Sequence, residues 1–198
     1  MQRRVFDTLM SLAGVVMVVV LLVAGALLLV GANFANSNVH DQLAAQQIYF
    51  PSQTAFQHAK AGTEITPGMI PYLEKYAGQQ LLTGAQAEAY ANHFISVHLS
   101  EMPYGGVYAK ISAAAMANPK DASLQALVNT SFKGTTLRGL LLEAYAFSVF
   151  GQIAQWASIA SFILAAIMLI LVIFGLVHSR RVPEDLHVGQ PRRDLVNA

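Results

Sequence analysis

The stretch WASIASFILAAIMLILVIFGLV, residues 156–177, decides the fold of this chain. It contains no charged residue, and a helix needs about 20 apolar residues to cross the hydrocarbon core of a bilayer. Trp156 stands at its start, where interfacial aromatic residues concentrate. A buried core helix is the alternative interpretation, but a soluble chain of this size rarely contains two such runs. The stretch therefore predicts a transmembrane helix.

The second apolar run covers residues 9–32 near the start of the chain. It ends in Val30-Gly31-Ala32, and small residues of this kind also precede the cleavage site of a secretory signal. The apolar core of a signal has only about 7 to 15 residues, however, and this run has roughly 24. We therefore expect a retained transmembrane anchor, with a cleaved signal as the alternative.

Composition supports a membrane protein. Apolar residues make up 55% of the 198 residues and charged residues only 12%, about half the charge of a typical soluble domain. The net charge of +1 gives no reason to expect a nucleic-acid partner. The chain has no cysteine, which excludes disulfides, thiolate metal sites and cysteine nucleophiles.

The basic residues beside the spans predict the topology. Arg3 and Arg4 precede the first span, and Arg180 and Arg181 follow the second. Cytoplasmic flanks are enriched in Lys and Arg, so we expect both termini in the cytoplasm of a multi-pass plasma-membrane protein. The expected parts are a cytoplasmic N-terminus (1–8), transmembrane helix 1 (9–32), a helical extracytoplasmic domain (33–155), transmembrane helix 2 (156–177) and a disordered cytoplasmic tail (178–198).

The segment between the spans is typical of helices, so the predicted fold class is all-α. Thr83 and Gln86 form a capping-box pattern, and Asn118-Pro119 predicts a helix end. A proline-free stretch runs from Thr135 or Thr136 to Arg181, which predicts that the second span continues outward as a long central helix with a kink at Gly151. Shorter helices are expected around it at about 67–77, 84–102, 106–117 and 122–132.

His93, His98 and Glu101 form the densest group of metal-capable side chains. On one straight α-helix, His98 and Glu101 lie about 60° apart, but His93 lies about 140° from His98. One straight helix therefore cannot direct all three toward one ion, and His40 or His58 would have to complete a site from elsewhere. We therefore expect no metal, no cofactor and no catalytic residue, and keep these three residues as candidates for an alternative metal site.

Ala157, Ser161 and Ala165 recur every four residues in the second span. Small residues at this spacing let another helix approach closely. That helix is either the first span of the same chain or a helix of another membrane protein, including a second copy. Neither span contains an ionisable residue, which ion and proton pathways normally require, so a transporter working alone is not expected.

Four segments resemble a family of small two-span membrane proteins from actinobacteria. The resemblance covers nearly the whole chain except the C-terminal tail. It implies a plasma-membrane location and brings no catalytic residue; some members are labelled aromatic ring-opening dioxygenases, a chemistry that the helix geometry above argues against. The segments are ANFANSNVHDQLAAQQIYFP (32–51), GTEITPGMIPYLEKYAGQQL (62–81), HFISVHLSEMPYGGVY (93–108) and GTTLRGLLLEAYAF (134–147).

Three functions are compatible with these features. The first is a non-catalytic binding or accessory protein, possibly a subunit of a larger membrane or envelope assembly. The second is an envelope enzyme with a His/Glu metal site, and the third is a domain that binds a lipid or another apolar ligand. Convergent histidines would favour the second function and a deep apolar pocket the third. A solid core with an exposed apolar patch would favour the first.

We predict that the first span is retained in the mature protein, because its apolar core is longer than that of a cleaved signal. Intact-mass measurement of protein extracted from membranes should give a mass that includes residues 1–32. A mature chain that starts at Asn33 would contradict the anchor.

Overall fold

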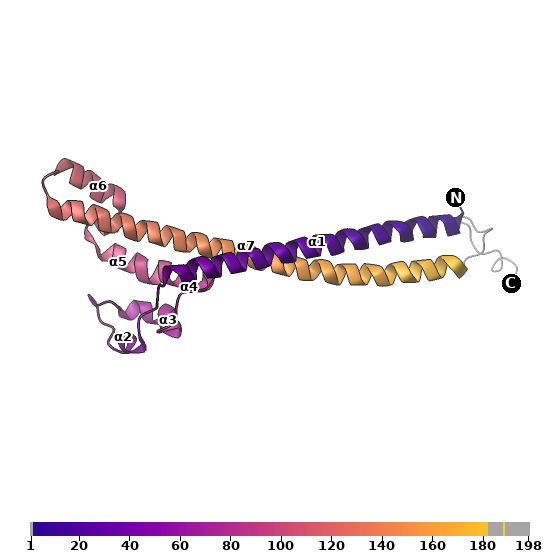
Figure 1. Cartoon of the computed structure of the whole chain (residues 1–198), viewed down its shortest axis with the longest axis horizontal. Helices are drawn as coiled ribbons and strands as arrows, with labels where there is room; N and C mark the ends of the chain where they lie inside the picture. The colour runs from indigo at the N-terminus through magenta and orange to yellow at the C-terminus, as the bar shows by residue number, and fades with distance from the viewer. Residues whose placement is uncertain (1, 182–187, 189–198) are drawn as a thin grey trace. The chain divides into compact units, whose positions relative to one another are not determined.

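The computed structural model describes residues 2–181 and residue 188, and the described elements are all helices. The described residues form two compact units (Figure 1): a paired-helix unit that contains residues 2–32 and 153–181, and a helical unit from residues 33–152. The long helices α1 (Arg3–Gln46) and α7 (Ala122–Arg181) supply residues to both. The all-α prediction is confirmed.

Helices α1 and α7 are each long and apolar enough to cross a membrane. The most apolar window of each has a mean hydropathy of 3.0, and only 17% and 11% of the residues in these windows are buried. A core helix of a soluble protein would be mostly buried. The large side chains of both helices, such as Leu27 and Phe174, are instead exposed.

Helix α7 begins earlier than the sequence predicts. The predicted start at Thr135 or Thr136 and the separate helix 122–132 are both wrong, because one helix runs from Ala122 through this region. Its N-cap is Asp121, whose carboxylate accepts hydrogen bonds from the amides of Ser123 and Leu124 at 2.9 and 3.2 Å. Bonds from the Ser123 hydroxyl and these amides lower the pKa of Asp121.

The C-terminal end of α7 reaches Arg181. Residues 178–181 are therefore helical and not part of a disordered tail. The remainder of the predicted tail, apart from residue 188, lies outside the described residues.

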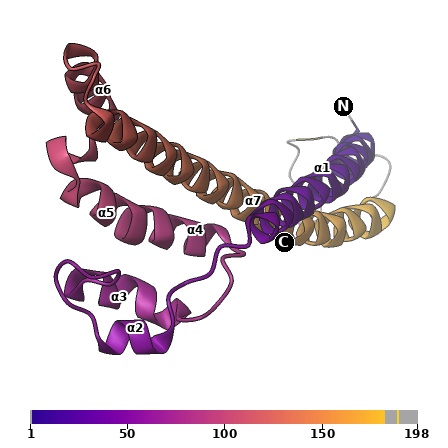
Figure 2. The same cartoon turned by 60° about the vertical axis from the view of Figure 1, so that its left-hand side comes forward.

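Within the helical unit, the chain folds back on the outer part of α7 in layers (Figure 2). A first layer of α4 (Gly84–Tyr90), the π-helical segment η3 (Ala91–Ile95) and α5 (Ser96–Glu101) lies beside α7. A second layer of α2 (Gln53–Gln57) and α3 (Ile70–Leu73) lies farther out, with turns η1 (Pro67–Met69) and η2 (Glu74–Tyr76) next to α3. Helix α6 (Tyr108–Ala117) pairs with the start of α7.

Most of the predicted short helices are present, but their bounds and helix types differ from the prediction. The predicted helix 67–77 is a succession of three short helical segments over residues 67–76, and the predicted helix 84–102 is a helical stretch over residues 84–101 with the π-helical segment in its middle. The Thr83 capping box is formed, with Thr83 Oγ1 accepting from the Gln86 amide at 3.3 Å and Gln86 Oε1 accepting from the Thr83 amide at 3.0 Å. Helix α2 lies outside the predicted helices and was not expected.

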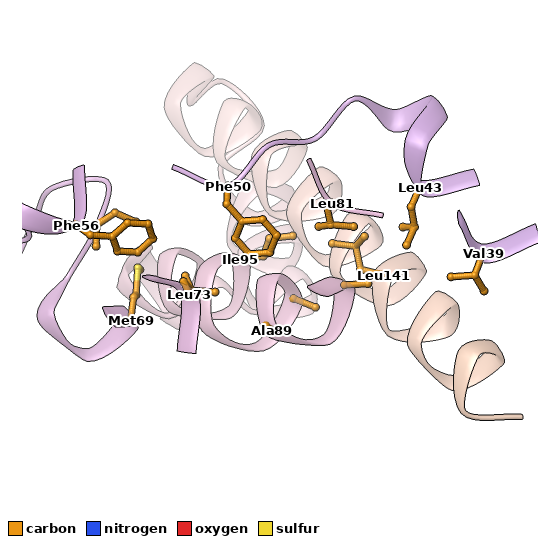
Figure 3. Close-up of a cluster of buried hydrophobic side chains, with 13 residues drawn as sticks. Val39, Leu43, Phe50, Phe56, Met69, Leu73, Leu81, Ala89, Ile95 and Leu141 are labelled. Carbon is orange, nitrogen blue, oxygen red and sulfur yellow. The ribbon is translucent and has the colours of Figure 1, made fainter. Parts of the chain in front are cut away.

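The core of the helical unit joins side chains from both layers, α1 and α7 (Figure 3). Phe50 from the loop after α1 is buried, as are Phe56, Met69 and Leu73 of the second layer and Leu141 of α7. Burial of each such side chain contributes roughly 1.5–3 kcal/mol. The second layer is therefore held by apolar contact.

The corner between α5 and α6 requires glycine. The turn η4 (Pro103–Gly106) contains Tyr104, Gly105 and Gly106 with φ values of 59°, 65° and 67°. A Cβ on Gly106 would collide with the carbonyl of Leu99, while the Gly106 carbonyl accepts a 2.8 Å bond from the buried Ser131 hydroxyl. The left-handed backbone and the close contact explain the paired glycines.

The short helices cover only one side of α7, which corrects the expectation that they surround it. Leu141 is 2% exposed, whereas Leu140 is 58% and Phe147 41% exposed. The helix is also continuous through Gly151, where a Cβ would lie only 3.1 Å from the Cβ of Ala35. Gly151 thus permits close packing on α1 within an unbroken helical stretch.

We predict that Ala146→Pro destabilises the helical unit by about 3 kcal/mol or more, because proline removes a helical hydrogen bond and clashes with the preceding turn. Ala146 is exposed, so little packing is lost by the substitution itself. Protease resistance of the helical unit in membranes measures the effect. Ala146→Ser is the matched control and should retain resistance; unchanged resistance in Ala146→Pro would show that α7 does not support the unit there.

Candidate interaction surface

In the paired-helix unit, α1 and α7 meet along a row of small residues. The buried or half-buried positions recur at alternating intervals of three and four residues, which is the heptad repeat of a coiled coil. Of the predicted packing residues, Ala165 is buried in this row, Ser161 is half-buried in it, and Ala157 is half-buried beside it. The row comprises Ser11, Gly14, Val18, Leu21, Gly25, Leu28 and Ala32 of α1, and Ser158, Ser161, Ala165, Met168, Val172, Gly175 and Ser179 of α7.

The closest contacts of this row involve residues outside the predicted helix-packing set of Ala157, Ser161 and Ala165. The buried Ser158 hydroxyl donates a 2.7 Å hydrogen bond to the carbonyl of Gly25. A Cβ on Gly25 would lie 3.0 Å from the ring of Phe162, and one on Gly175 would lie 2.7 Å from the Ser11 hydroxyl. Small side chains thus let the helices approach until a hydroxyl reaches the facing backbone. Counting every seventh residue (158, 165, 172, 179) would have found this face.

We predict that Ala165→Leu destabilises the pairing of α1 and α7, because overpacking a filled contact costs about 1–3 kcal/mol. The matched control is Ala166→Leu, since Ala166 is exposed on the same helix turn. Thermal unfolding of the full chain in detergent should show a lower midpoint for Ala165→Leu only. Equal midpoints for the two variants would show that the row is not a packed contact.

The candidate metal residues are engaged elsewhere. The ring of His93 stacks on Tyr72, with centroids 3.5 Å apart and planes 1° from parallel, and His98 Nδ1 donates to the Phe94 carbonyl at 2.8 Å. Glu101 is exposed at the end of α5. Among the described residues, no three His, Asp or Glu side chains are grouped to hold a metal ion.

The two histidines considered as completing ligands also have local partners. His58 Nδ1 donates to the Thr54 carbonyl at 2.8 Å, and His40 lies 3.2 Å from the carboxylate of Asp41. The π-helical segment changes the rotation between His93 and His98 from that of a straight α-helix. Each of the four histidines therefore contacts a different neighbour, and the contacts do not bring their rings to a common point.

Aromatic rings fill the space between α4 and the loop after α1. Phe50 contacts Tyr76 and Tyr90 with centroids 5.1 and 5.4 Å apart, Tyr90 stacks on Phe94 at 4.6 Å, and Phe94 contacts His98 at 4.5 Å. Burial, with a smaller contribution from the charge of Glu64, raises the pKa of the Tyr90 hydroxyl. This part of the unit is a packed core.

An open groove of about 390 Å³ lies between α1 and α7 in the helical unit. Its floor consists of the buried side chains of Val39, Leu43 and Leu141. One wall is apolar, because Leu140 and Phe147 of α7 are exposed along it. The combination of a packed core and an exposed apolar surface is typical of a protein-binding site.

The opposite wall of the groove is polar but uncharged. It presents the amide side chains of Asn38, Gln42 and Gln46 on α1. Glu143 of α7 is the only charged residue among those that line the groove. The surface therefore offers an apolar stripe, a row of hydrogen-bonding groups and one negative charge.

A polar network fixes α7 against the first layer of the helical unit. Arg138 Nη2 donates to Asn92 Oδ1 at 2.9 Å, and Asn92 Nδ2 donates to Glu88 Oε1 at 3.0 Å. Such bonds between elements restrain the rotation of α7 about its axis. They hold Leu141 toward the core and Leu140 toward the groove.

No family model, curated protein or solved structure matches this chain.

Proposed function

We propose that this is a membrane-anchored, non-catalytic binding protein that acts as an accessory subunit of a larger membrane or envelope assembly. Its anchor would be the paired helices, whose large apolar side chains face outward into lipid. The observation that carries the proposal is the exposed apolar groove beside a well-packed core. A groove of this kind is costly to expose to water unless a partner covers it.

The proposed location is the plasma membrane, with both termini in the cytoplasm and residues 33–152 outside. Arg3, Arg4, Arg180 and Arg181 flank the two apolar stretches at the ends of α1 and α7, where the positive-inside tendency favours the cytoplasm. Membership of the actinobacterial family of two-span proteins is part of this proposal and is supported by the four sequence segments.

A second candidate function is binding of a lipid or another apolar ligand. It is favoured by the apolar floor of the same groove, but the amide wall and the open shape fit a partner that carries its own polar groups. A metal-dependent enzyme is the third candidate. His93 stacks on Tyr72 and His98 bonds to the Phe94 carbonyl, so these two rings give that candidate no support.

We predict that single cysteines at Lys60 and Lys120 label from outside intact cells, whereas one at Gln190 does not. The native chain has no cysteine, so each introduced thiol reports one position, and both lysines are exposed. Labelling at residue 190 alone would show the reverse orientation.

Isolation from native membranes in mild detergent tests the accessory role. The proposal predicts a complex in which a second membrane polypeptide is present in a fixed ratio to the full chain. A single copy of the chain in light scattering would contradict the accessory role if no second polypeptide co-purifies. This result must hold at every detergent concentration that extracts the chain.

A further inference from the structure

The heptad positions of the two long helices continue from the paired-helix unit into the groove of the helical unit. Counting back in sevens from Ser158 gives Gly151, Ala144 and Leu137, and the intervening positions are residues 154, 147 and 140. On α1, the positions after Ala32 are residues 35, 39, 42 and 46. Within the helical unit, Gly151 still contacts Ala35, so the groove begins where an established helix contact ends.

Beyond that contact, only part of the heptad row is buried. Val39 remains buried, and Leu137 and Ala144 are half-buried. At two positions the neighbouring residue is buried instead, because Leu43 is buried beside the exposed Gln42, and Leu141 beside the exposed Leu140. Adjacent residues lie about 100° apart around a helix, so Gln42, Leu140 and Phe147 are left exposed along the groove.

The start of α4 accounts for part of this pattern. Gly84 packs directly against Ser148, so closely that a Cβ there would collide with the serine side chain. Ser148 is buried while the neighbouring Phe147 is exposed. This contact favours burial of the side of α7 that faces α4 and the core, and it leaves the heptad positions Leu140 and Phe147 exposed.

We propose that this groove binds an amphipathic helix of another membrane protein, which continues the heptad packing as a third strand. The inference rests on the proposed function and assigns it a site and a partner chemistry. The partner helix would place an apolar stripe against Leu140 and Phe147, polar side chains toward Gln42 and Gln46, and a Lys or Arg near Glu143. This is helix-in-groove recognition, in which residues three and four apart serve as anchors.

A second copy of the chain is a poorer occupant. Two copies in one membrane would be related by a twofold axis along the membrane normal, so a contact through this face would hold both Glu143 carboxylates at the same depth in one interface. Like charges at an interface are unfavourable. The charge of the groove thus selects a cationic helix from a different protein.

Site-specific photocrosslinking in native membranes tests the inference. The full chain would carry benzoylphenylalanine at Leu140 or Phe147, which are exposed in the groove, and at Tyr145 as the control. Tyr145 is also an exposed aromatic residue but lies about 200° around α7 from Phe147. We expect adducts from Leu140 and Phe147, and at most weak adducts from Tyr145.

The attached peptide should map to a helix that carries an apolar three-four repeat and a Lys or Arg next to the attachment site. Glu143→Gln should lower the yield by up to about fivefold, the range of a surface ion pair, and Glu143→Lys should lower it further. Glu101→Lys, an exposed substitution outside the groove, should leave the yield unchanged.

Four results would overturn the inference. They are adducts with phospholipid, adducts with a second copy, a protein adduct that is insensitive to Glu143→Lys, and no adduct in the groove. If benzoylphenylalanine at Phe132, far from the groove on α7, instead captured the polypeptide that co-purifies with the chain, the accessory role would stand and only the assigned site would fail.

Discussion

The close approach of α1 and α7 in the paired-helix unit is the constraint on which the architecture depends. It is possible because the contact positions carry little or no side chain at Gly14, Gly25, Ala165 and Gly175. In an apolar environment there is no hydrophobic gain in bringing two apolar helices together, so close packing and hydrogen bonds must stabilise the pair. The bond from Ser158 to the Gly25 carbonyl is the most direct example.

In the helical unit, α7 packs on α4 and the core as well as on α1. The core includes Leu141 from α7 and Leu43 from α1, and Gly84 of α4 packs against Ser148. With these contacts formed, the heptad positions Leu140 and Phe147 of α7 stay exposed. The proposed binding groove follows from a competition between two packing faces on the same helix.

The sequence predicted the elements whose signals are local. The apolar runs, the Thr83 capping box and the helix end at Asn118 depend on neighbouring residues, and they are present in the structure. The start of α7 was misplaced because Thr135 and Thr136 are common N-cap types, although here they lie within the helix while Asp121 caps it.

The groove could not be predicted in the same way, and the packing row is not marked by hydrophobic periodicity. In a continuously apolar run, polar and apolar residues do not alternate, so the contact face is visible only in the seven-residue spacing that starts at Ser158. The exposure of Leu140 beside the buried Leu141 depends on where α4 packs. The π-helical segment, which alters the rotation between His93 and His98, was likewise not expected from the sequence.

The most direct measurement of the central claim is disulfide formation between cysteines at Ser11 and Gly175 in the full chain in native membranes. A Cβ on Gly175 would lie 3.9 Å from the Cβ of Ser11, within the usual range of a disulfide, and no native cysteine competes. Close pairing of α1 and α7 predicts rapid, nearly complete oxidation within one chain, and little for the pair at Leu12 and Gly175, since Leu12 faces outward. Equal oxidation of the two pairs, or no disulfide from the first, would contradict the pairing of α1 and α7 along their small residues.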